Sequence, residues 1–332
     1  MSRLKAVKKT WAMSCRFMPD PWSRLRCFFD ALGCGIRHGA SPENYFVLHF
    51  FDMDEKQRAL FLTSGRSRAA DAQLNRNAAE RDKKLIGRKE LFDAGFSGLV
   101  KRDFLYVPEG GREGFEAFLR RHDSFIVKPS CGTMGHGIEK LCTAGLDREA
   151  FYARCCGEKL LLEELIVQHP ALAEINRDSV NTVRVNAARA SSGDVRFIGA
   201  CLKCGGAGAV TDNFHSGGLA YPLDMETGRV TGPGRSNKNL TEYMRHPGSG
   251  RYMPGFSVPF WPQVLEIVKQ GMDRVASLGY VGWDIAIRPD GPELVEGNYN
   301  WPGGNIIQFD GVGKYPLILD CLGDGNERDI KK

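Results

Sequence analysis

Alternation of apolar and polar residues predicts a β-hairpin near the C-terminal end of the chain. In the stretch GWDIAIRPDGPELVEGNYN (282–300), apolar Trp283 and Ile285 alternate with Asp284, so Asp284 lies on the second face of a strand. After a turn rich in Pro, Asp and Gly, the same alternation predicts a second strand with three side chains on one face: Leu294, Glu296 and Asn298. Carboxylates on such a face are costly to bury unless a cation compensates their charge.

The remaining patterns predict a mixture of strands and helices. Strands are expected at 104–107, 124–130, 160–166, 181–190 and 195–205. Helices are expected at 81–96, 114–122 and 262–279, and residues 1–75 are expected to be mainly helical. The elements do not follow a strict strand–helix–strand order, and hairpins are frequent. We therefore predict an α+β fold with antiparallel sheets.

Composition places the chain among ordinary globular proteins. Of its 332 residues 42% are hydrophobic and 26% are charged, and 45 basic against 40 acidic residues give a net charge of +5. This charge is too small to indicate a nucleic-acid partner. The sequence shows neither a secretory signal nor an apolar run long enough to span a membrane, so we expect a cytoplasmic protein with its ten cysteines reduced.

The N-terminal segment is more basic than the rest of the chain. Residues 1–26 contain seven Lys or Arg and one acid, Asp20. Apolar side chains recur there at helical spacing: Leu4, Val7, Trp11, Cys15 and Met18. This pattern predicts an amphipathic basic helix. We expect it to pack on the body of the protein, and the alternative is contact with an anionic membrane surface.

A glycine-rich segment follows the strand that ends near Lys128. The stretch IVKPSCGTMGHGIEKL (126–141) contains three closely spaced glycines: Gly132, Gly135 and Gly137. Glycines allow backbone N–H groups to approach an anion closely, and a lysine adds positive charge. The spacing fits neither the P-loop nor the dinucleotide fingerprint. A phosphate-handling segment and an ordinary glycine-rich turn both remain open from this pattern.

Three further stretches carry candidate binding groups. In LLLEELIVQH (160–169), Glu163 and Glu164 end a strand whose backbone either clasps an adenine or simply meets solvent. Arg184 lies inside a predicted strand, where it requires an anionic ligand or a structural acid. The loop VTDNFHSGGLAYPLD (210–224) concentrates polar and glycine residues: Asp212, Asn213, His215, Gly217 and Gly218.

The only Cys-x-x-Cys pair, Cys201 and Cys204, lacks the second pair that a zinc site usually needs, so we interpret both as core thiols. A magnesium site is better supported. Mg²⁺ binds oxygen ligands and typically takes one or two carboxylates together with substrate phosphates. Asp284, Glu296 and the amide oxygen of Asn298 meet this requirement. Together with Lys128, they predict a site for Mg²⁺ and a nucleotide.

Taken in order, these parts resemble the ATP-grasp superfamily, and more specifically its sugar-transfer-associated family. The resemblance runs from about residue 41 to residue 310 and rests on seven stretches: RDKKL, FIVKPSCGTMGHGI, LLLEELIVQHP, SVNTVRV, VTDNFHSGG, HPGSG and GWDIAIRPDGPELVEGNYNWPGG. It implies two α+β subdomains that hold ATP between them, with a mobile glycine-rich lid. The implied organisation is a helical extension (1–75), an N-terminal ATP-grasp part (76–166) and a C-terminal part (167–332).

The resemblance also implies roles for individual residues. Phosphate contacts fall to Lys83 and Lys128, and Arg184 faces the γ-phosphate or an acyl phosphate. The adenine hinge comprises Glu163, Glu164, Leu165 and Ile166. The metal ligands are Asp284, Glu296 and Asn298, with Mg²⁺ as the ion and Mn²⁺ as a substitute. Many relatives have a ribose-binding acid after the hinge, and here Gln168 is the candidate in its place.

The implied reaction joins a small carboxylate, such as an amino acid, to an amine through an acyl phosphate, with release of ADP. Lys128 neutralises the transferring phosphoryl group, and Arg184 with N–H groups of Gly217 and Gly218 stabilises the oxyanion. The family name associates the acceptor with the assembly of surface polysaccharides or related metabolites. Alternatives are a kinase acting on a hydroxyl or sugar, and a nucleotide-binding regulator without turnover.

Overall fold

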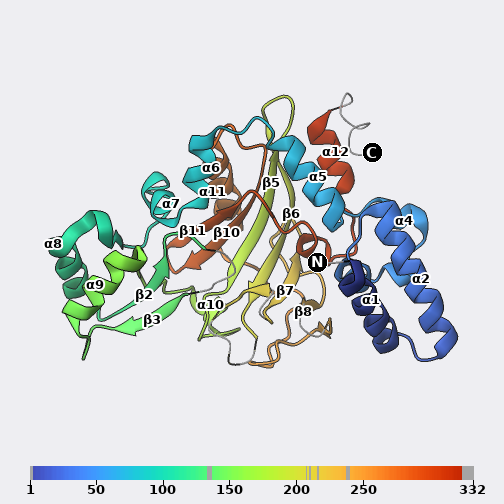
Figure 1. The fold of residues 1–332 in the computed structure, drawn as a ribbon, viewed down its shortest axis with the longest axis horizontal. Coiled ribbons are helices and arrows are strands. Elements are labelled where there is room, and N and C mark those ends of the chain that lie inside the picture. The colour runs from blue at the N-terminus through green and yellow to red at the C-terminus, as the bar shows by residue number, and fades with distance from the viewer. Residues whose placement is uncertain are drawn as a thin grey trace.

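A computed structural model of the chain describes residues 3–132, 137–206, 208, 211–214, 217–236 and 240–323. Two antiparallel sheets and the helices around them form the described part, which confirms the predicted α+β class. Figure 1 shows the smaller sheet in a lobe at the left, the larger sheet in the centre and a group of N-terminal helices at the right. Each helix within the described ranges is too short or too polar to traverse a lipid bilayer.

The larger sheet has seven strands. In spatial order they are β11 (Gly291–Asn298), β10 (Tyr280–Arg288), β5 (Thr182–Arg189), β6 (Val195–Cys204), β7 (Leu219–Leu223), β8 (Gly234–Ser236) and β9 (Glu242–Tyr243). One face packs on α11 (Trp261–Arg274), whose apolar stripe includes Val264 and Val268. Gly271 of this helix lies against the ring of Trp283, and a Cβ there would come within 3.1 Å of it. The absent side chain thus allows the helix to approach the sheet closely.

The second face of this sheet is divided between an apolar region and a charged region. Ala188, Ile198 and Tyr280 belong to a core shared with the N-terminal helices and with α12 (Tyr315–Leu322). The 3-10 helix η3 (Ile306–Gln308) completes that core. The charged region of the same face carries Arg184 and Asp284, which are buried and form part of the candidate site.

The smaller sheet has the order β1 (Phe104–Tyr106), β4 (Leu160–Glu164), β2 (Ser124–Pro129) and β3 (Glu139–Cys142). The helices α8 (Val107–Arg121) and α9 (Arg148–Glu158) cover one of its faces, with Phe125 and Leu162 at the centre of that core. Lys128 and Glu163 alternate with these apolar residues and therefore lie on the opposite face. The short helix α10 (Pro170–Ala173) follows β4.

The elements described between Arg3 and Leu74 are helical. They are α1 (Arg3–Phe17), α2 (Pro21–His38), α3 (Pro42–Val47), η1 (Phe50–Asp52), α4 (Glu55–Ala59) and α5 (Ser64–Leu74). The carboxylate of Asp20 caps α2 by accepting a hydrogen bond from the Ser23 N–H, and Gly39 ends it at φ 63°. Against expectation, the predicted apolar stripe of α1 is not its packing face: α1 buries Thr10, Met13 and Ser14 instead.

The helix predicted over residues 81–96 is interrupted. It consists of α6 (Glu80–Gly87) and α7 (Lys89–Gly95), separated by Arg88 in an extended conformation with φ −117° and ψ 120°. At this break the Lys89 N–H donates to the carbonyl of Ser130, which joins the helical pair to the smaller sheet. Because this tertiary hydrogen bond links distant segments, the break was not predictable from helical periodicity.

Candidate functional site

The candidate site begins with a row of charged side chains across three adjacent strands of the larger sheet. Arg184 on β5 pairs in register with Asp284 on β10, and Asp284 pairs with Glu296 on β11. Residues that pair directly across antiparallel strands point to the same face. Arg184 Nε and Nη2 donate to the carboxylate of Asp284 at 2.8 and 2.7 Å, and Nη1 donates to the Pro302 carbonyl at 3.0 Å. These contacts use three of the five guanidinium N–H groups.

A β-bulge positions Glu296 in this row. Asp284 pairs with Glu296, but Ile285 pairs with Leu294, so Val295 has no partner on β10. Leu294 consequently packs in the core on the opposite face, and the prediction that Leu294 shares a face with Glu296 is wrong. Arg102 stabilises the bulge by donating to the carbonyls of Leu294 at 2.8 Å and Val295 at 3.3 Å.

A second cation, Lys203 on β6, lies beside Asp284. Its Nζ is 3.1 Å from Oδ1 of Asp284 and 3.7 Å from Oδ2 of Asp212. Asp212 also accepts hydrogen bonds from the N–H and the hydroxyl of Thr182. Burial alone would lower the pKa of Lys203, but the charges of Asp212 and Asp284 raise it above its usual value. Lys203 is therefore a protonated, buried lysine that the sequence analysis missed.

The two carboxylates of the hairpin have opposite pKa shifts. Burial favours a higher pKa for Asp284, but the charges of Arg184 and then Lys203 outweigh this effect and hold it well below the usual value. Partial removal of Glu296 from water, followed by repulsion from Asp284, raises the pKa of Glu296. Because Glu296 is nevertheless exposed, its carboxylate is accessible to a cation. A divalent cation would relieve the repulsion that raises the Glu296 pKa.

The donor set suits Mg²⁺ together with a nucleotide. The amide of Asn298 donates from Nδ2 to Oε1 of Glu296 at 3.3 Å, which directs its carbonyl oxygen away from that contact. Among the described residues, no group of three or more His, Cys, Asp or Glu side chains has the geometry of a metal site. Two carboxylates and one amide match an ion that completes its shell with phosphate oxygens and water.

A buried ionic cluster lies on the smaller sheet. Lys128 forms an ion pair with Glu163, and Arg102 Nε lies 3.3 Å from the same carboxylate. Arg102 Nη2 also contacts Asp93 at 2.5 Å. Burial raises the pKa of a carboxyl group, but Arg102 and Lys128 outweigh it at Glu163 and hold that pKa well below its usual value. Lys128 is thus fixed by Glu163 on the face that α8 and α9 leave open.

Lys89, which the sequence analysis did not select, lies beside the glycine-rich segment. Its Nζ donates to the carbonyls of Pro129 at 3.1 Å and Gly132 at 3.0 Å. Burial, and then the charge of Lys128, lowers the pKa of Lys89, whereas Glu296 acts in the opposite direction. Lys89 therefore lies within electrostatic range of both the smaller sheet and the hairpin. The predicted phosphate ligand Lys83 is on α6 and is half-buried.

The glycine-rich segment is described in part. Gly132 and Gly137 adopt φ values of +145° and +75°, in the region that favours glycine. Gly135 lies outside the described residues. A Cβ on Gly137 would lie 3.0 Å from the Pro129 ring. Backbone conformation therefore requires glycine at two of the three candidate positions. This is compatible both with a phosphate-handling segment and with an ordinary glycine-rich turn.

The adenine-hinge residues follow the end of β4. Glu164 accepts a hydrogen bond from the Asp103 N–H at 3.0 Å and lies 3.7 Å from Arg288, while Leu165 and Ile166 are half-buried just beyond the strand. Gln168 is fully engaged inside the protein. Its amide donates to the carbonyls of Asn176 and Ser179, and its oxygen accepts twice from Asn181. We therefore withdraw Gln168 as the ribose contact.

The polar loop is only partly placed at the site. Asp212 joins it through Lys203, whereas His215 lies outside the described residues. The N–H groups of Gly217 and Gly218 donate to the carbonyls of Phe214 and Asn213. Because both donors are engaged within the loop, the predicted use of these N–H groups for an oxyanion is wrong for this conformation.

The Cys-x-x-Cys pair does not form a metal or redox site. Cys201 is in register with Arg184 and belongs to the core shared with the N-terminal helices, whereas Cys204 belongs to the core under α11. Both thiols are buried and unoxidised, on opposite faces of β6. The prediction that they are core thiols agrees with these positions.

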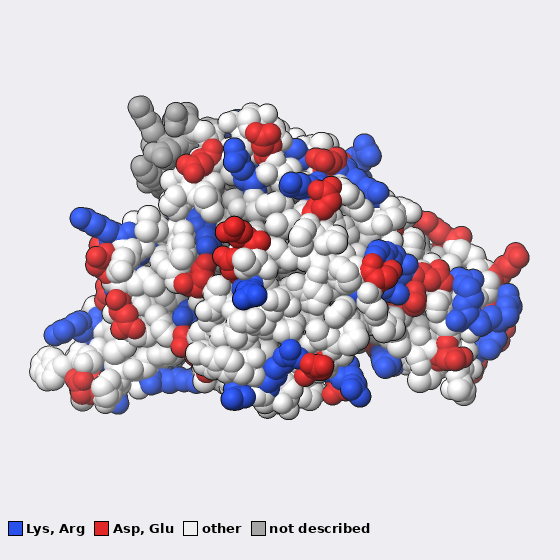
Figure 2. Space-filling model, turned by 180° about the vertical axis from the view of Figure 1, so that it is seen from behind, with Lys and Arg blue, Asp and Glu red and all other residues white. Residues whose placement is uncertain are grey.

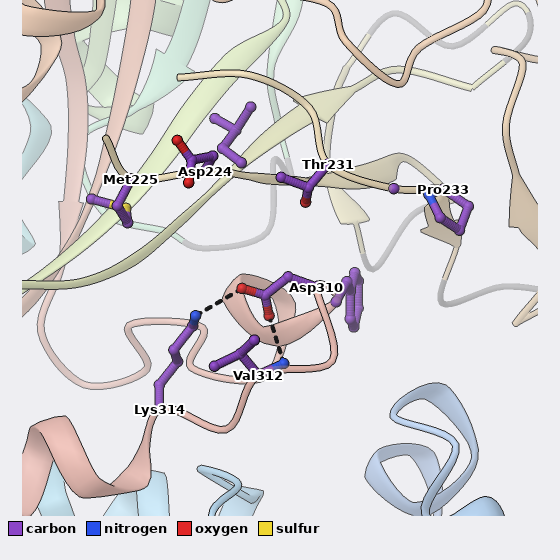
Figure 3. Close-up of a pocket in the computed structure, with 10 residues that line it drawn as sticks. Asp224, Met225, Thr231, Pro233, Asp310, Val312 and Lys314 are labelled. Carbon is purple, nitrogen blue, oxygen red and sulfur yellow. Dashed lines mark hydrogen bonds and ion pairs between the residues drawn. The ribbon is translucent and has the colours of Figure 1, made fainter. Parts of the chain in front are cut away.

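A hollow of about 610 Å³ lies outside this site, between the end of β7 and the loop that precedes α12. Figure 3 shows Lys314 and the Val312 N–H directed toward the Asp310 carboxylate, with distances of 2.7 and 3.0 Å. The two groups that approach Asp310 thus satisfy its carboxylate from within the same loop. We place the chemistry at the charged row instead, because perturbed carboxylates and cations converge there.

Comparison with known proteins gives one family match. Residues 151–315 match the model of the family described as sugar-transfer associated ATP-grasp. Comparison with curated proteins gives no match.

Several solved structures share part of this fold. The ATP-grasp ligase PsnB, complexed with a phosphomimetic variant of its minimal precursor, Mg and ADP, is 16% identical, with a TM-score of 0.44 over 77% of this chain and 61% of that chain. N5-carboxyaminoimidazole ribonucleotide synthetase from Thermus thermophilus is 15% identical, with a TM-score of 0.41 over 65% of this chain and 45% of that chain. D-alanyl-alanine synthetase A from Vibrio cholerae is 11% identical, with a TM-score of 0.45 over 74% and 66%. The chain thus spans less than two thirds of the length of the first two.

Proposed function

Residues 151–315 of the chain match the family described as sugar-transfer associated ATP-grasp, and from this premise we propose that the protein is an ATP-dependent ligase. It joins a small carboxylate, such as an amino acid, to an amine or another nucleophile through an acyl phosphate, and it releases ADP and phosphate. Mg²⁺ is the expected metal, and Mn²⁺ is expected to replace it because both ions accept carboxylate and amide oxygens.

One observation carries this proposal: Asp284 and Glu296 lie side by side on β10 and β11, with Asn298 next on the same face. Arg184 and Lys203 compensate the buried Asp284, whereas Glu296 remains exposed and has a raised pKa. A purely structural ion network would not require Glu296, which is exposed and is repelled by the charge of Asp284. The set supports a Mg²⁺ site, and bound Mg²⁺ would supply positive charge to neutralise phosphate oxygens.

The residues of the chain account for the proposed first step. Lys128 and Lys89 provide positive charge on the smaller-sheet side, where a γ-phosphoryl group needs it as charge shifts onto the leaving ADP. A carboxylate oxygen of the substrate attacks the γ-phosphorus, and the bond to the β–γ bridging oxygen breaks. The products of this step are an acyl phosphate and ADP. No nucleophile from the protein is needed.

In the second step the amine attacks the carbonyl carbon of the acyl phosphate. An oxyanion develops there, and collapse of the tetrahedral intermediate expels inorganic phosphate while the nitrogen loses a proton. We assign stabilisation of this oxyanion to Arg184, which Asp284 and the Pro302 carbonyl hold in one orientation. A fixed cation needs little reorganisation when the charge appears, which is the physical basis of its catalytic effect.

The test is incubation of the protein with ATP, Mg²⁺ and a panel of small carboxylates, with ADP and AMP separated by chromatography. Hydroxylamine is added as a trap, and we expect ADP together with a hydroxamate that requires both ATP and the true carboxylate. AMP as the product would overturn the acyl-phosphate mechanism. A stable phosphorylated hydroxyl would instead identify a kinase, and nucleotide binding without turnover on any substrate would identify a regulator.

The matched variants are Glu296→Gln and Glu266→Gln. Glu296→Gln removes one metal-binding charge from an exposed position, so turnover should fall by at least about a hundredfold while the fold is retained. Glu266 is an exposed glutamate on α11 that accepts a hydrogen bond from Gln270, and its replacement should leave turnover unchanged. Unchanged activity in a folded Glu296→Gln variant would refute the metal assignment.

A further inference from the structure

The first two helices of the chain carry an apolar surface that faces solvent. On α1 it consists of Leu4, Val7 and Trp11, which follow one another at helical spacing. On α2 it consists of Trp22, Leu25, Phe29 and Ile36. The exposed fractions are large: 80% for Trp22, 65% for Phe29 and 86% for Ile36. We call these seven residues the hairpin patch, where the word hairpin refers to the helices α1 and α2 and not to the strands β10 and β11.

Aromatic contacts join the two parts of the hairpin patch across the helices. Trp11 of α1 packs edge-on against Phe28 of α2, with ring centroids 5.6 Å apart, and Phe28 in turn contacts Phe29 at 5.3 Å. On α2 the patch lies opposite the buried face, which contains Cys27 and Cys34. Both helices therefore use one face to hold the fold and leave another apolar face uncovered. Such an exposed apolar surface marks an interaction site.

Basic side chains flank the patch on both helices, and the acid that precedes Trp22, Asp20, is hydrogen-bonded to Ser23 at the start of α2. Lys8 follows Val7 on α1 and Arg26 follows Leu25 on α2, and both side chains are exposed. The sequence of α1 contains no acid. The carboxylate of Asp30 on α2 is bound by Arg58 at 2.8 and 2.7 Å and turns toward the protein. Figure 2 shows basic side chains, some acidic side chains and uncharged surface together at the left, where α1 and α2 form that end of the molecule.

We propose that α1 and α2 dock this protein on an anionic phospholipid surface, with the hairpin patch inserted among the lipids and the basic residues against the headgroups. Tryptophan and bulky aliphatic side chains flanked by Lys and Arg are suited to the boundary between headgroups and acyl chains. A second copy of this chain is a poorer occupant, because pairing two patches would bring like charges together. The helices lie on the surface, since none of the described helices can cross a bilayer.

This docking leaves the candidate site accessible. The charged row lies on the central sheet, and the N-terminal helices sit at one end of the molecule (Figure 1). The main contacts of α1 and α2 are to each other and to the neighbouring N-terminal elements α3, η1 and α4, and the N-terminal core continues to the sheet through α5 and α12. A ligase held in this way would act on substrates presented at a membrane surface. The docking does not depend on the proposed reaction.

The experiment is flotation of the full chain with vesicles of phosphatidylcholine alone or of an equimolar mixture with phosphatidylglycerol. We expect binding to the mixed vesicles, at least about tenfold weaker binding to phosphatidylcholine alone, and weakening of binding by salt. Trp22→Ser with Phe29→Ser should reduce binding by about tenfold or more through lost apolar contact. Lys8→Glu with Arg26→Glu should do the same through reversed charge.

The matched control is Val312→Ser with Leu317→Ser, which changes two exposed apolar residues near α12 and should leave binding unchanged. Circular dichroism and thermal unfolding should be the same in all variants, because the substituted side chains are exposed to solvent. Failure of the folded protein to bind the mixed vesicles would overturn the proposal. A dimer that Trp22→Ser with Phe29→Ser abolishes, without vesicle binding, would identify a second copy as the occupant instead.

Discussion

Arg184 and Asp284 face each other on β5 and β10, and the guanidinium of Arg184 holds both carboxylate oxygens of Asp284 at 2.8 and 2.7 Å. Both side chains are buried. The depressed pKa of Asp284 keeps this carboxylate ionised, so its contribution to stability is present above its unfolded pKa and is lost as the pH falls through the folded value. This pair therefore links the stability of the sheet to the geometry of the candidate site.

Arg184→Ala should affect both properties. Removing one partner of a buried ion pair leaves the other charge uncompensated, which lowers the free energy of unfolding by about 3–5 kcal/mol. Loss of a transition-state cation should also lower turnover by about two orders of magnitude or more. Arg184→Lys separates the effects: it retains a charge and more stability, but it cannot reproduce the two-point contact.

Urea unfolding and ADP release measure these two effects. Arg189→Ala is the control, because Arg189 lies on the same strand with its side chain directed to the Gly193 carbonyl and to Asp273. It should leave turnover unchanged. Wild-type turnover in folded Arg184→Lys would show that Arg184 is structural only.

Lys203 should help Arg184 to hold the pKa of Asp284 low. Lys203→Met removes a cation 3.1 Å from Asp284 and 3.7 Å from Asp212, so the pKa values of both carboxyl groups should rise. We expect the turnover rate at neutral pH to be at least about tenfold lower than that of the wild type. The acidic limb of the pH–rate profile should move to higher pH. Lys203→Arg, which keeps the charge, should restore the position of that limb. A profile of unchanged shape in Lys203→Met would contradict this role.

Lys89 and Lys83 give competing predictions for nucleotide binding. Lys89 contacts the carbonyls of Pro129 and Gly132 at the glycine-rich segment, whereas the family resemblance points to Lys83 on α6. Lys89→Met should weaken ATP binding by about tenfold, because it removes both a charge and this attachment. Isothermal titration calorimetry on Lys89→Met and Lys83→Met compares the two lysines directly. If only Lys83→Met binds ATP more weakly, the phosphate contact belongs to Lys83, as the family resemblance implies.

Local patterns in the sequence were sufficient to predict much of the fold. Period-two alternation predicted β5, β6 and the hairpin of β10 and β11, because each strand packs one face on a core. The family match over residues 151–315 agrees with the resemblance to ATP-grasp proteins in that part of the chain. Helical periodicity also predicted α11, whose apolar stripe covers the larger sheet. These elements depend mainly on near neighbours in the chain and on one buried face.

Features that depend on distant segments were not predictable. The bulge at Val295, which turns Glu296 away from Leu294, is held by Arg102 almost two hundred residues earlier. Lys203 lies in an apolar strand whose alternation alone gives no sign of the two acids beside it. Gln168 was a wrong candidate for another reason: its partners are only 8 to 13 residues away, but side-chain hydrogen bonds of this kind leave no periodic pattern in the sequence. Each error comes from a polar contact between segments, which local periodicity does not encode.

The cluster around Arg102 predicts an unusual dependence of stability on pH. Burial, followed by the charge of Glu163, raises the pKa of Asp93 to about 8. The folded protein therefore holds a proton that the unfolded chain, with a value near 3.8, releases. The stabilisation is complete below the unfolded pKa and is lost as the pH rises through about 8. Asp93→Asn mimics the protonated form at every pH.

We expect Asp93→Asn to retain the contact with Arg102, to differ least from the wild type at acid pH, and to melt higher at about pH 9, by on the order of 5 °C. Thermal unfolding across this range provides the measurement. Asp273→Asn is the control, because Asp273 is 70% exposed on α11 and its replacement should not change the pH profile. If the melting curves of Asp93→Asn and wild type stay parallel from acid to alkaline pH, Asp93 is ionised in the folded protein and the cluster carries one more negative charge than we infer.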